Sequence, residues 1–237
     1  MHAGGTLADY FVANNDCVWP VPDHVSNTQA AALSVTYGTS YFGLKHRGHL
    51  EAGEVLLVLG ASGGVGTAAI QLGKVFGATV IAAAGSAAKL QVCRDQGADH
   101  VINYQEEDIV ERVKALTDGR GADVVYDPIG GDMFDKVKRC INWEGRIVII
   151  GFASGRIPSI ECNRLLLKNM SVIGLAWGQY LARDPAKGAA CQFELYDLLE
   201  QGKIDPVIYQ VLPFDKVRDG LALMESRELY GKVVIAR

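Results

Sequence analysis

A glycine-rich stretch, LGASGGVG at residues 59–66, is the part of the sequence best suited to binding a phosphate. It continues an apolar run, VLLVL, and precedes a segment with helical spacing, so it joins an expected strand to an expected helix. Ala61, Gly63 and Gly66 occupy the three small-residue positions of a dinucleotide-binding turn, with Ala replacing the first Gly. Such a turn brings a pyrophosphate close to the backbone at a helix N-terminus, where an anion is stabilised. We therefore expect a pyrophosphate site; the alternative is a turn that only packs helix against sheet. No Lys-Ser or Lys-Thr follows Gly66, which argues against a P-loop.

The segment after the next expected strand reads AAAGSAAK and indicates which dinucleotide would bind. An NAD-binding protein commonly places an acid about 20 residues after the loop, to accept hydrogen bonds from the ribose hydroxyls. Here the first acid is Asp95, well into the next helix, whereas Gly85 leaves room, Ser86 adds a hydroxyl and Lys89 a cation. Tyr104, at the end of the third expected strand, belongs to the same corner of such a sheet. This chemistry suits a 2′-phosphate and favours NADPH. The alternatives are a solvated lysine at Lys89 and an edge-strand aromatic at Tyr104.

The elements that must position these residues alternate between strand and helix from Glu54 onward. Short continuous apolar runs predict strands at 55–60, 78–85, 100–104, 145–152 and 170–177, and a further strand within 121–131 that breaks into a Pro/Gly turn. Apolar residues at helical spacing predict helices at 65–76, 86–96, 106–117 and 132–142. Glu106, Glu107 and Asp108 are expected in the first turn of the third helix. This alternation predicts a parallel sheet covered by helices on both faces. Ligands bind at the carboxyl ends of its strands, where the glycine turns at 60–66, 85, 130–131 and 151 all fall.

Both ends of the chain depart from this alternation. Residues 6–12 and 17–21 have the pattern of short strands. A helix is expected over 185–201, followed by the strand VIYQVLPF, a helix near 215–225 and a final strand, GKVVIAR. The two ends flank the central sheet, and we expect them to pack into a small second unit.

Composition excludes several classes of protein. The 237 residues carry a formal net charge of −4, which argues against nucleic-acid binding. No apolar run is long enough to span a membrane, and MHAGGTLADYF has no secretory or transit pattern. We expect a cytoplasmic protein with reduced thiols, because its cysteines are scattered and form no C-x-x-C pair: Cys17, Cys93, Cys140, Cys162 and Cys191. A mitochondrial form stays open, since a transit peptide could lie upstream.

His46 and His49 have a metal-like spacing without further ligands, so we expect an exposed loop and no metal.

Six stretches that together span essentially the whole chain resemble one protein family. They are GGTLADYFV, AALSVTYGTSYFGLKHRGHLEAGEVLLVLGASGGVG, GADHVINYQEED, VVYDPIGGDMF, GRIVIIGFASG and ESRELYGKVV. In order and spacing they resemble the medium-chain dehydrogenase/reductase superfamily, and within it the zinc-independent quinone oxidoreductases related to zeta-crystallin. The resemblance implies a doubly wound, six-stranded parallel Rossmann sheet. It also implies dimers or tetramers in which NADPH reduces quinones or other electron-poor alkenes and carbonyls without a metal.

The resemblance assigns roles to individual residues by their place in these motifs. Those that would contact the pyrophosphate are Ser62, Gly63, Gly64 and Val65. Those that would hold the 2′-phosphate are Ser86, Lys89 and Tyr104. Those that would line the adenosine and nicotinamide riboses are Gly130, Gly151, Phe152 and Ala153. Thr36 resembles a threonine beside the nicotinamide, and Arg227 resembles a C-terminal arginine that reaches back to the cofactor. The alternatives are a hydroxyl at a helix N-terminus for Thr36 and a solvated arginine for Arg227.

The front of the chain departs from the family. A full member begins with a GroES-like catalytic domain whose Asn and Tyr face the substrate, and this sequence begins where that domain is nearly complete. The resemblance therefore predicts a remnant of that domain over 1–30, an NADP-binding Rossmann domain over 31–177, and a return to the catalytic domain over 178–237.

Two functional hypotheses follow. The first is an NADPH-dependent reductase that works by direct hydride transfer, with catalysis mainly from placing the reactants together. The alternative is a truncated, weakly active or inactive protein that binds NADPH and pairs with subunits. No side chain is an evident proton donor: Tyr37 and Tyr41 fall near the nicotinamide in the resemblance, but packing is the role we expect for both. MSVIGLAW is apolar enough to pair with the same strand of a partner, which predicts a homodimer.

Overall fold

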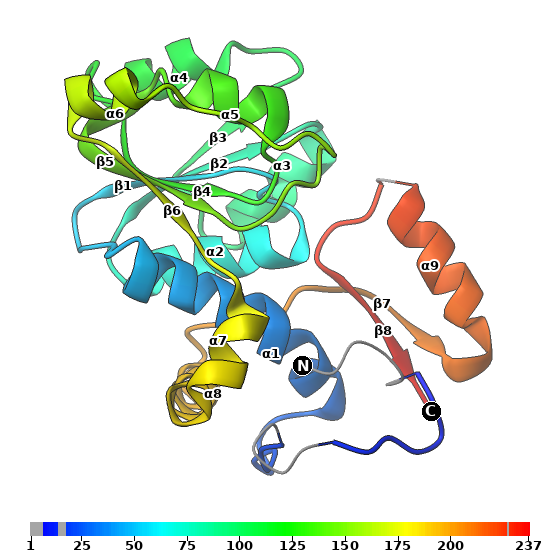
Figure 1. Cartoon of the computed structure of the whole chain (residues 1–237). Coiled ribbons are helices and arrows are strands. Elements are labelled where there is room, and N and C mark those ends of the chain that lie inside the picture. Colours follow the sequence, from blue (N-terminus) through cyan, green and yellow to red (C-terminus); the bar gives the residue numbers. More distant parts are fainter. Residues whose placement is uncertain (1–6, 14–17, 227) are drawn as a thin grey trace.

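A parallel β-sheet forms the centre of the protein. The computed structural model describes residues 7–13, 18–226 and 228–237. Its main sheet has six strands in the order β3-β2-β1-β4-β5-β6, and every neighbouring pair is parallel (Figure 1). The strands are β1 Val55–Val58, β2 Thr79–Ala84, β3 His100–Asn103, β4 Ala122–Asp127, β5 Ile141–Ile149 and β6 Ser171–Gly174. This order is that of a doubly wound Rossmann sheet, so the predicted fold is confirmed.

Helices cover both faces of the sheet, which explains why its strands read as continuous apolar runs. Leu56 and Val58 of β1 pack toward α1 Asn27–Tyr41, α2 Gly64–Val75 and α3 Ala87–Asp95. Val55 and Leu57 point to the opposite face, toward α4 Ile109–Leu116, α5 Gly131–Val137 and α6 Cys162–Lys168. Because successive side chains of a strand alternate between faces, a strand covered on both sides needs no polar positions. Within the described part of the chain, no helix has the length and apolar character to cross a membrane.

Several predicted element boundaries are wrong, among them the end of the strand expected over 170–177, since β6 ends at Gly174 and the next helix begins at Trp177. Local hydrogen bonds explain two others. The Asp108 carboxylate accepts hydrogen bonds from the backbone N–H groups of Val110 (2.8 Å) and Glu111 (3.1 Å), which makes Asp108 the N-cap of α4. Glu106 and Glu107 therefore precede the helix instead of lying in its first turn. Farther along, α5 ends before residue 142, because β5 already begins at Ile141 and pairs there with β4.

The two short strands predicted at the start of the chain are not formed in its described residues. Residues 7–13 and 18–22 contain no strand, and within the first segment Tyr10 is 94% and Val12 92% exposed. A strand is stable only when a neighbour accepts and donates its backbone hydrogen bonds. No described strand pairs with these segments in either sheet, so their local alternation of apolar residues does not produce a strand.

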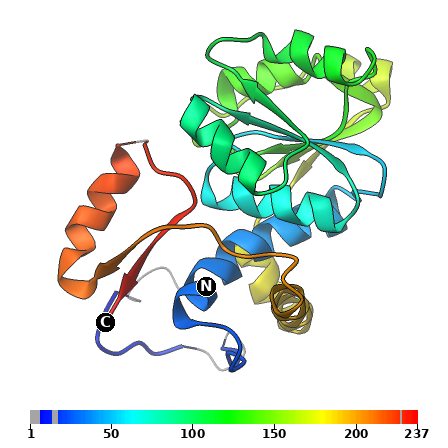
Figure 2. The same ribbon diagram turned by 180° about the vertical axis from the view of Figure 1, so that it is seen from behind.

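The C-terminal part of the chain returns to the first helix and then forms a separate lobe. After α7 Trp177–Arg183, helix α8 Pro185–Glu200 packs against α1. The C-terminal lobe follows: β7 Ile208–Pro213 and β8 Lys232–Ala236 pair in parallel, and η3 Phe214–Lys216 and α9 Val217–Glu225 connect them. Figures 1 and 2 show this lobe beside the sheet domain, with the described N-terminal segment running past β8. An ion pair joins Asp9 to Arg237, so the described N-terminal segment contacts the C-terminal end of the chain, whereas their packing into one small unit stays a prediction. The division at residues 30 and 177 stays a prediction.

Candidate functional site

The glycine-rich turn between β1 and α2 has the shape of an anion cradle. Gly60 has a φ of 56°, so the tight bend falls at Gly60 and not at Ala61, where the motif alignment placed it. A Cβ on Gly66 would lie 2.7 Å from the Cα of Ala61, so this glycine lets the helix pack close to the strand. Gly63 is the N-cap of α2 and has no side chain to cap it. The first N–H groups of the helix have no intrahelical acceptor, and an anion at the turn can accept from them.

Thr36 is brought next to this turn by α1, an element that the sequence reading did not assign. The helix begins at a capping box formed by Ser26 and Gln29. Thr36 lies in the middle of the helix and its hydroxyl donates to the Ala32 carbonyl, so the alternative of a helix N-terminal hydroxyl is wrong. Its methyl carbon would be 3.1 Å from a Cβ on Gly64. The structure thus brings Thr36 next to Gly64, one of the residues predicted to contact a pyrophosphate.

The remaining residues of the turn are fixed through their backbone. The Ser62 carbonyl accepts a hydrogen bond from the N–H of Gly231 at 2.8 Å, and the Ser62 residue is buried. The Val65 carbonyl accepts from the Ser40 hydroxyl at 2.9 Å. The turn is therefore held from both sides before any ligand is present, so less conformational entropy is lost when a ligand binds to it.

A cavity of about 630 Å³ joins four of the residues singled out for the 2′-phosphate corner: Gly85, Ser86, Lys89 and Tyr104. The Tyr104 hydroxyl would lie 3.0 Å from a Cβ on Gly85, so the glycine makes room for the phenol. Ser86 is the N-cap of α3 and accepts from the N–H of Lys89 at 3.4 Å. Burial raises the pKa of Tyr104, so its hydroxyl stays a neutral hydrogen-bond donor. A cation, two hydroxyls and a helix N-terminus around one cavity fit a phosphate.

The outer wall of the same cavity comes from the far end of the chain, which sequence reasoning missed. Tyr209, Glu228 and Tyr230 line it, and the two tyrosine rings meet edge to face with centroids 4.9 Å apart. More than 100 residues separate these side chains from the Rossmann residues they face, so spacing in the sequence gave no signal for them. Arg227, predicted to reach the cofactor, lies outside the described residues.

The two turns predicted to line the riboses lie against each other. Gly130 has a φ of 66°, and a Cβ there would lie 3.0 Å from the ring of Phe152. The N–H of Ala153 donates to the Pro128 carbonyl at 3.1 Å, and that of Gly151 to the Asp127 carbonyl at 3.4 Å. The turn after β4 and the turn after β5 therefore form one continuous surface at the carboxyl edge of the sheet.

Asp127, which the sequence reading did not assign, organises that surface. One of its carboxylate oxygens, Oδ1, accepts hydrogen bonds from the N–H groups of Ile129 and Gly130, both at 2.8 Å. The other, Oδ2, is buried and has no hydrogen-bond partner among the described residues. Burial outweighs the two hydrogen bonds and raises the pKa of Asp127. This carboxyl fixes the backbone of the turn that carries Gly130.

The tyrosines considered as proton donors are packing residues. Tyr37 and Tyr41 are each 1% exposed. The Tyr37 hydroxyl lies within hydrogen-bond distance of two acceptors, Gln71 Oε1 (2.7 Å) and the Asp205 carbonyl (3.0 Å), and Tyr41 contacts the Lys45 ammonium. Burial raises the pKa of both phenols above the ordinary tyrosine value. Both side chains are therefore committed to joining α1 to its neighbours, as the packing interpretation expected.

The two histidines with metal-like spacing do not form a loop site. His46 belongs to a π-helical turn, Phe42–Arg47, and its ring lies 4.4 Å from the ring of Phe42, so the expected exposed loop is wrong at this residue. The aromatic neighbour accounts for the partial burial of the imidazole. Across residues 7–13, 18–226 and 228–237, no group of three or more His, Cys, Asp or Glu could hold a metal ion.

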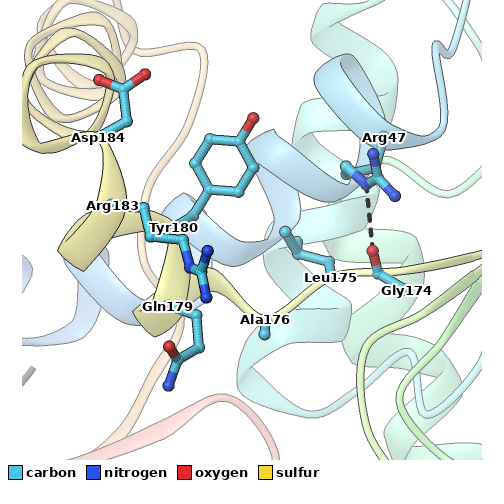
Figure 3. Close-up of a pocket in the computed structure, with 8 residues that line it drawn as sticks. All are labelled: Arg47, Gly174, Leu175, Ala176, Gln179, Tyr180, Arg183 and Asp184. Carbon is cyan, nitrogen blue, oxygen red and sulfur yellow. Dashed lines mark hydrogen bonds between the residues drawn. The ribbon is translucent and has the colours of Figure 1, made fainter.

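Two further cavities lie beyond the end of β6. One, of about 430 Å³, lies between α1 and the ends of β5 and β6, and Val35, Ile150 and Trp177 are among its mainly apolar walls. The other, of about 460 Å³, lies on the outer side of β6 (Figure 3). There the Arg47 guanidinium donates to the Gly174 carbonyl at 3.2 Å, and Tyr180 comes from α7. Two residues of α1 line the first of these cavities, Val35 and Thr39, whereas Thr36 lines neither.

The Rossmann sheet and the three turns at its carboxyl edge define a nucleotide-binding α/β protein, and comparisons with known proteins place it in a family. The family model for zinc-binding dehydrogenases matches residues 64–191. Quinone oxidoreductase-like protein 2 homolog from Nematostella vectensis is 41% identical over 234 residues, which cover 98% of this chain and 64% of that protein. The rat quinone oxidoreductase-like protein 2 is 38% identical over 232 residues, covering 98% of this chain and 66% of that protein.

Solved structures agree with these sequence matches. The Escherichia coli quinone oxidoreductase, solved in complex with NADPH, superimposes with a TM-score of 0.86 at 31% identity, covering 94% of this chain and 69% of that one. The chain therefore belongs to the medium-chain dehydrogenase/reductase superfamily, in its quinone oxidoreductase-like family. It spans 64% to 66% of the length of the two curated relatives named above.

Proposed function

We propose that this chain binds NADPH at the carboxyl edge of its sheet and transfers hydride to a quinone or another electron-poor alkene or carbonyl. The observation that carries the proposal is the cavity that Ser86, Lys89 and Tyr104 share, since it offers a cation and hydroxyls where a 2′-phosphate would lie. The glycine turn supplies the neighbouring pyrophosphate site. Family membership supports the same reading, because relatives are named as quinone oxidoreductases.

Glu228 modifies the expected selectivity. Its carboxylate lines the same cavity and opposes a phosphate there, whereas it could accept a hydrogen bond from a ribose hydroxyl. We therefore expect Lys89 to carry most of the preference for NADPH. Lys89→Ala should weaken NADPH about tenfold or more and leave NADH within about twofold. Glu228→Gln should shift the preference further toward NADPH, and equal effects of Lys89→Ala on both cofactors would contradict this assignment.

The residues of the chain would orient the reactants. The bound dinucleotide supplies a hydride at the nicotinamide C4. Thr36 and the turn of Gly151–Ala153 would hold the nicotinamide end, while the 430 Å³ cavity beside Val35 and Trp177 would receive an apolar acceptor. Because Tyr37 is fully engaged in hydrogen bonds, we assign it no role as a proton donor. Rate enhancement would then come from holding the two reactants in contact and excluding water.

The alternative is a weakly active or inactive protein that binds NADPH and pairs with subunits. The observation that favours it is that the chain covers only 64% to 66% of its curated relatives. Oxidation of NADPH by 9,10-phenanthrenequinone, followed at 340 nm with purified chain, separates the two. Saturable turnover above the rate without protein supports the reductase. Tight NADPH binding without turnover contradicts it and leaves the binding protein.

Two further parts of the proposal concern the partner and the location of the chain. Strand β6 lies at the edge of the sheet, and α6, which precedes it in the chain, exposes Leu166 (76%) and Leu167 (72%), so we propose a homodimer that pairs through β6. Light scattering on the purified chain tests this, and a monomer at micromolar concentration would contradict it. The cytoplasmic location predicted from the sequence is kept in the proposal, and imaging a tagged chain in cells would test it.

A further inference from the structure

The C-terminal lobe is attached directly to the glycine-rich turn. Gly63 and Gly231 form a parallel bridge, and the N–H of Gly231 donates to the Ser62 carbonyl at 2.8 Å. Gly231 has a φ of 54°, and a Cβ there would lie 2.8 Å from the Val207 side chain, so the contact requires glycine. The first residue of β8 is therefore fixed beside the N-terminus of α2.

That first residue is Lys232, and its side chain crosses the turn. Its Cδ would lie 2.7 Å and its Cγ 3.3 Å from a Cβ on Gly64, so the chain runs toward the turn as it extends. The backbone is fixed as well, because the N–H of Lys232 donates to the Val207 carbonyl at 2.9 Å. The residue is half-buried. Among the described residues, none forms an ion pair or hydrogen bond with its ammonium group.

We propose that Lys232 is a cofactor-binding residue that contacts the pyrophosphate, a role that rests on the proposed NADPH site. The ammonium lies two bonds beyond a carbon already packed on Gly64, at the helix N-terminus where the anion is expected. A lysine ammonium is a compact charge that binds phosphate well. Lys89 is different, because it faces the cavity of the 2′-phosphate. Lys232 therefore acts on the part of the dinucleotide that NADPH and NADH share.

The role of Lys232 is tested by comparing NADPH with NADH, because a residue that contacts the pyrophosphate affects the binding of both cofactors. Dissociation constants for NADPH and for NADH, from cofactor fluorescence, are compared for the wild type, Lys232→Met and Lys232→Arg. Methionine keeps the apolar stem over Gly64 and removes the charge, whereas arginine keeps the charge. Lys216→Met is the matched control, because Lys216 lies in the same lobe and pairs with Asp219.

We expect Lys232→Met to weaken both cofactors about tenfold or more and by similar factors. Lys232→Arg and Lys216→Met should bind within about threefold of the wild type, which is under 1 kcal/mol. The melting temperature of each unliganded variant is measured first, and Lys232→Gln replaces the Met variant if that variant unfolds. Binding by the neutral variant within twofold of the wild type, or weakening of NADPH alone, overturns the role of Lys232. A wild-type chain that binds neither cofactor would instead overturn the proposed function.

Discussion

Gly63→Ala tests the proposed cofactor site with little effect on the fold. Gly63 has φ −75° and ψ 171°, a conformation that alanine adopts readily. A Cβ there would meet only the Gly60 carbonyl oxygen, at 3.4 Å, which is an ordinary contact. The fold therefore accepts a methyl group at this position. A pyrophosphate that approaches the turn closely does not, because the methyl group would occupy its space.

The expected effect of Gly63→Ala on stability is smaller than its expected effect on NADPH affinity. Alanine restricts the unfolded chain, which stabilises by about 0.4–1 kcal/mol, but it is a poorer N-cap than glycine, so the two effects largely cancel. We expect the melting temperature to change by less than about 4 °C. A methyl group forced against a bound phosphate costs about 1–3 kcal/mol, which weakens NADPH about 5- to 150-fold.

Gly66→Ala is the matched comparison, because its added methyl group meets the backbone. Its Cβ would lie 2.7 Å from the Cα and the carbonyl carbon of Ala61, and neither atom can move without shifting the turn. Overpacking of this size costs about 1–3 kcal/mol and lowers the melting temperature by about 2–10 °C. Calorimetry on both variants, with NADPH titrations on each, measures the two effects separately. NADPH affinity unchanged in Gly63→Ala at an unchanged melting temperature would refute the close approach of the pyrophosphate to this turn.

Two other features give predictions that need no cofactor. Because burial raises the pKa of Asp127, its contribution to stability is fully present below the unfolded pKa, near 4, and is lost as pH rises through the folded value. Asp127→Asn should therefore gain stability relative to the wild type as pH rises above about 4, and a constant difference from pH 4 to 7 in urea titrations would contradict this. Among the thiols, Cys162 is exposed, whereas burial raises the pKa of Cys93 and of Cys140 to about 12. Iodoacetamide at pH 7.5, followed by peptide mass spectrometry, should modify Cys162 well before those two, and early labelling of Cys93 would be inconsistent with the packed core.

The alternation of strands and helices could be predicted because each element depends on its own residues. The apolar run that forms β1 is bounded by glycine turns, and both of its faces are covered, so local sequence specified it well. Helix α1 was not assigned, because small and polar residues interrupt any apolar stripe along it. Its Gly38 is explained only by the tertiary contact, since a Cβ there would lie 2.8 Å from the indole nitrogen of Trp177.

The candidate site was predictable where it follows a strand end and not where it depends on distant contacts. Ser86 and Lys89 follow β2 directly, so the topology of a parallel sheet placed them at the carboxyl edge. Tyr230 and Lys232 reach the same edge only because Gly231 binds to the glycine turn. The strands predicted at 6–12 and 17–21 do not form in the described residues of those segments, because their pattern is local and strand formation requires a pairing neighbour.

A titration of the purified chain with NADPH, read by the rise and blue shift of cofactor fluorescence, tests the central claim most directly. The account predicts saturable binding of one NADPH per chain, tighter than NADH, and weakened about 5- to 150-fold in Gly63→Ala. Fluorescence that rises without saturation, or binding that Gly63→Ala and Lys89→Ala leave unchanged, would contradict a dinucleotide site at the turns of this sheet.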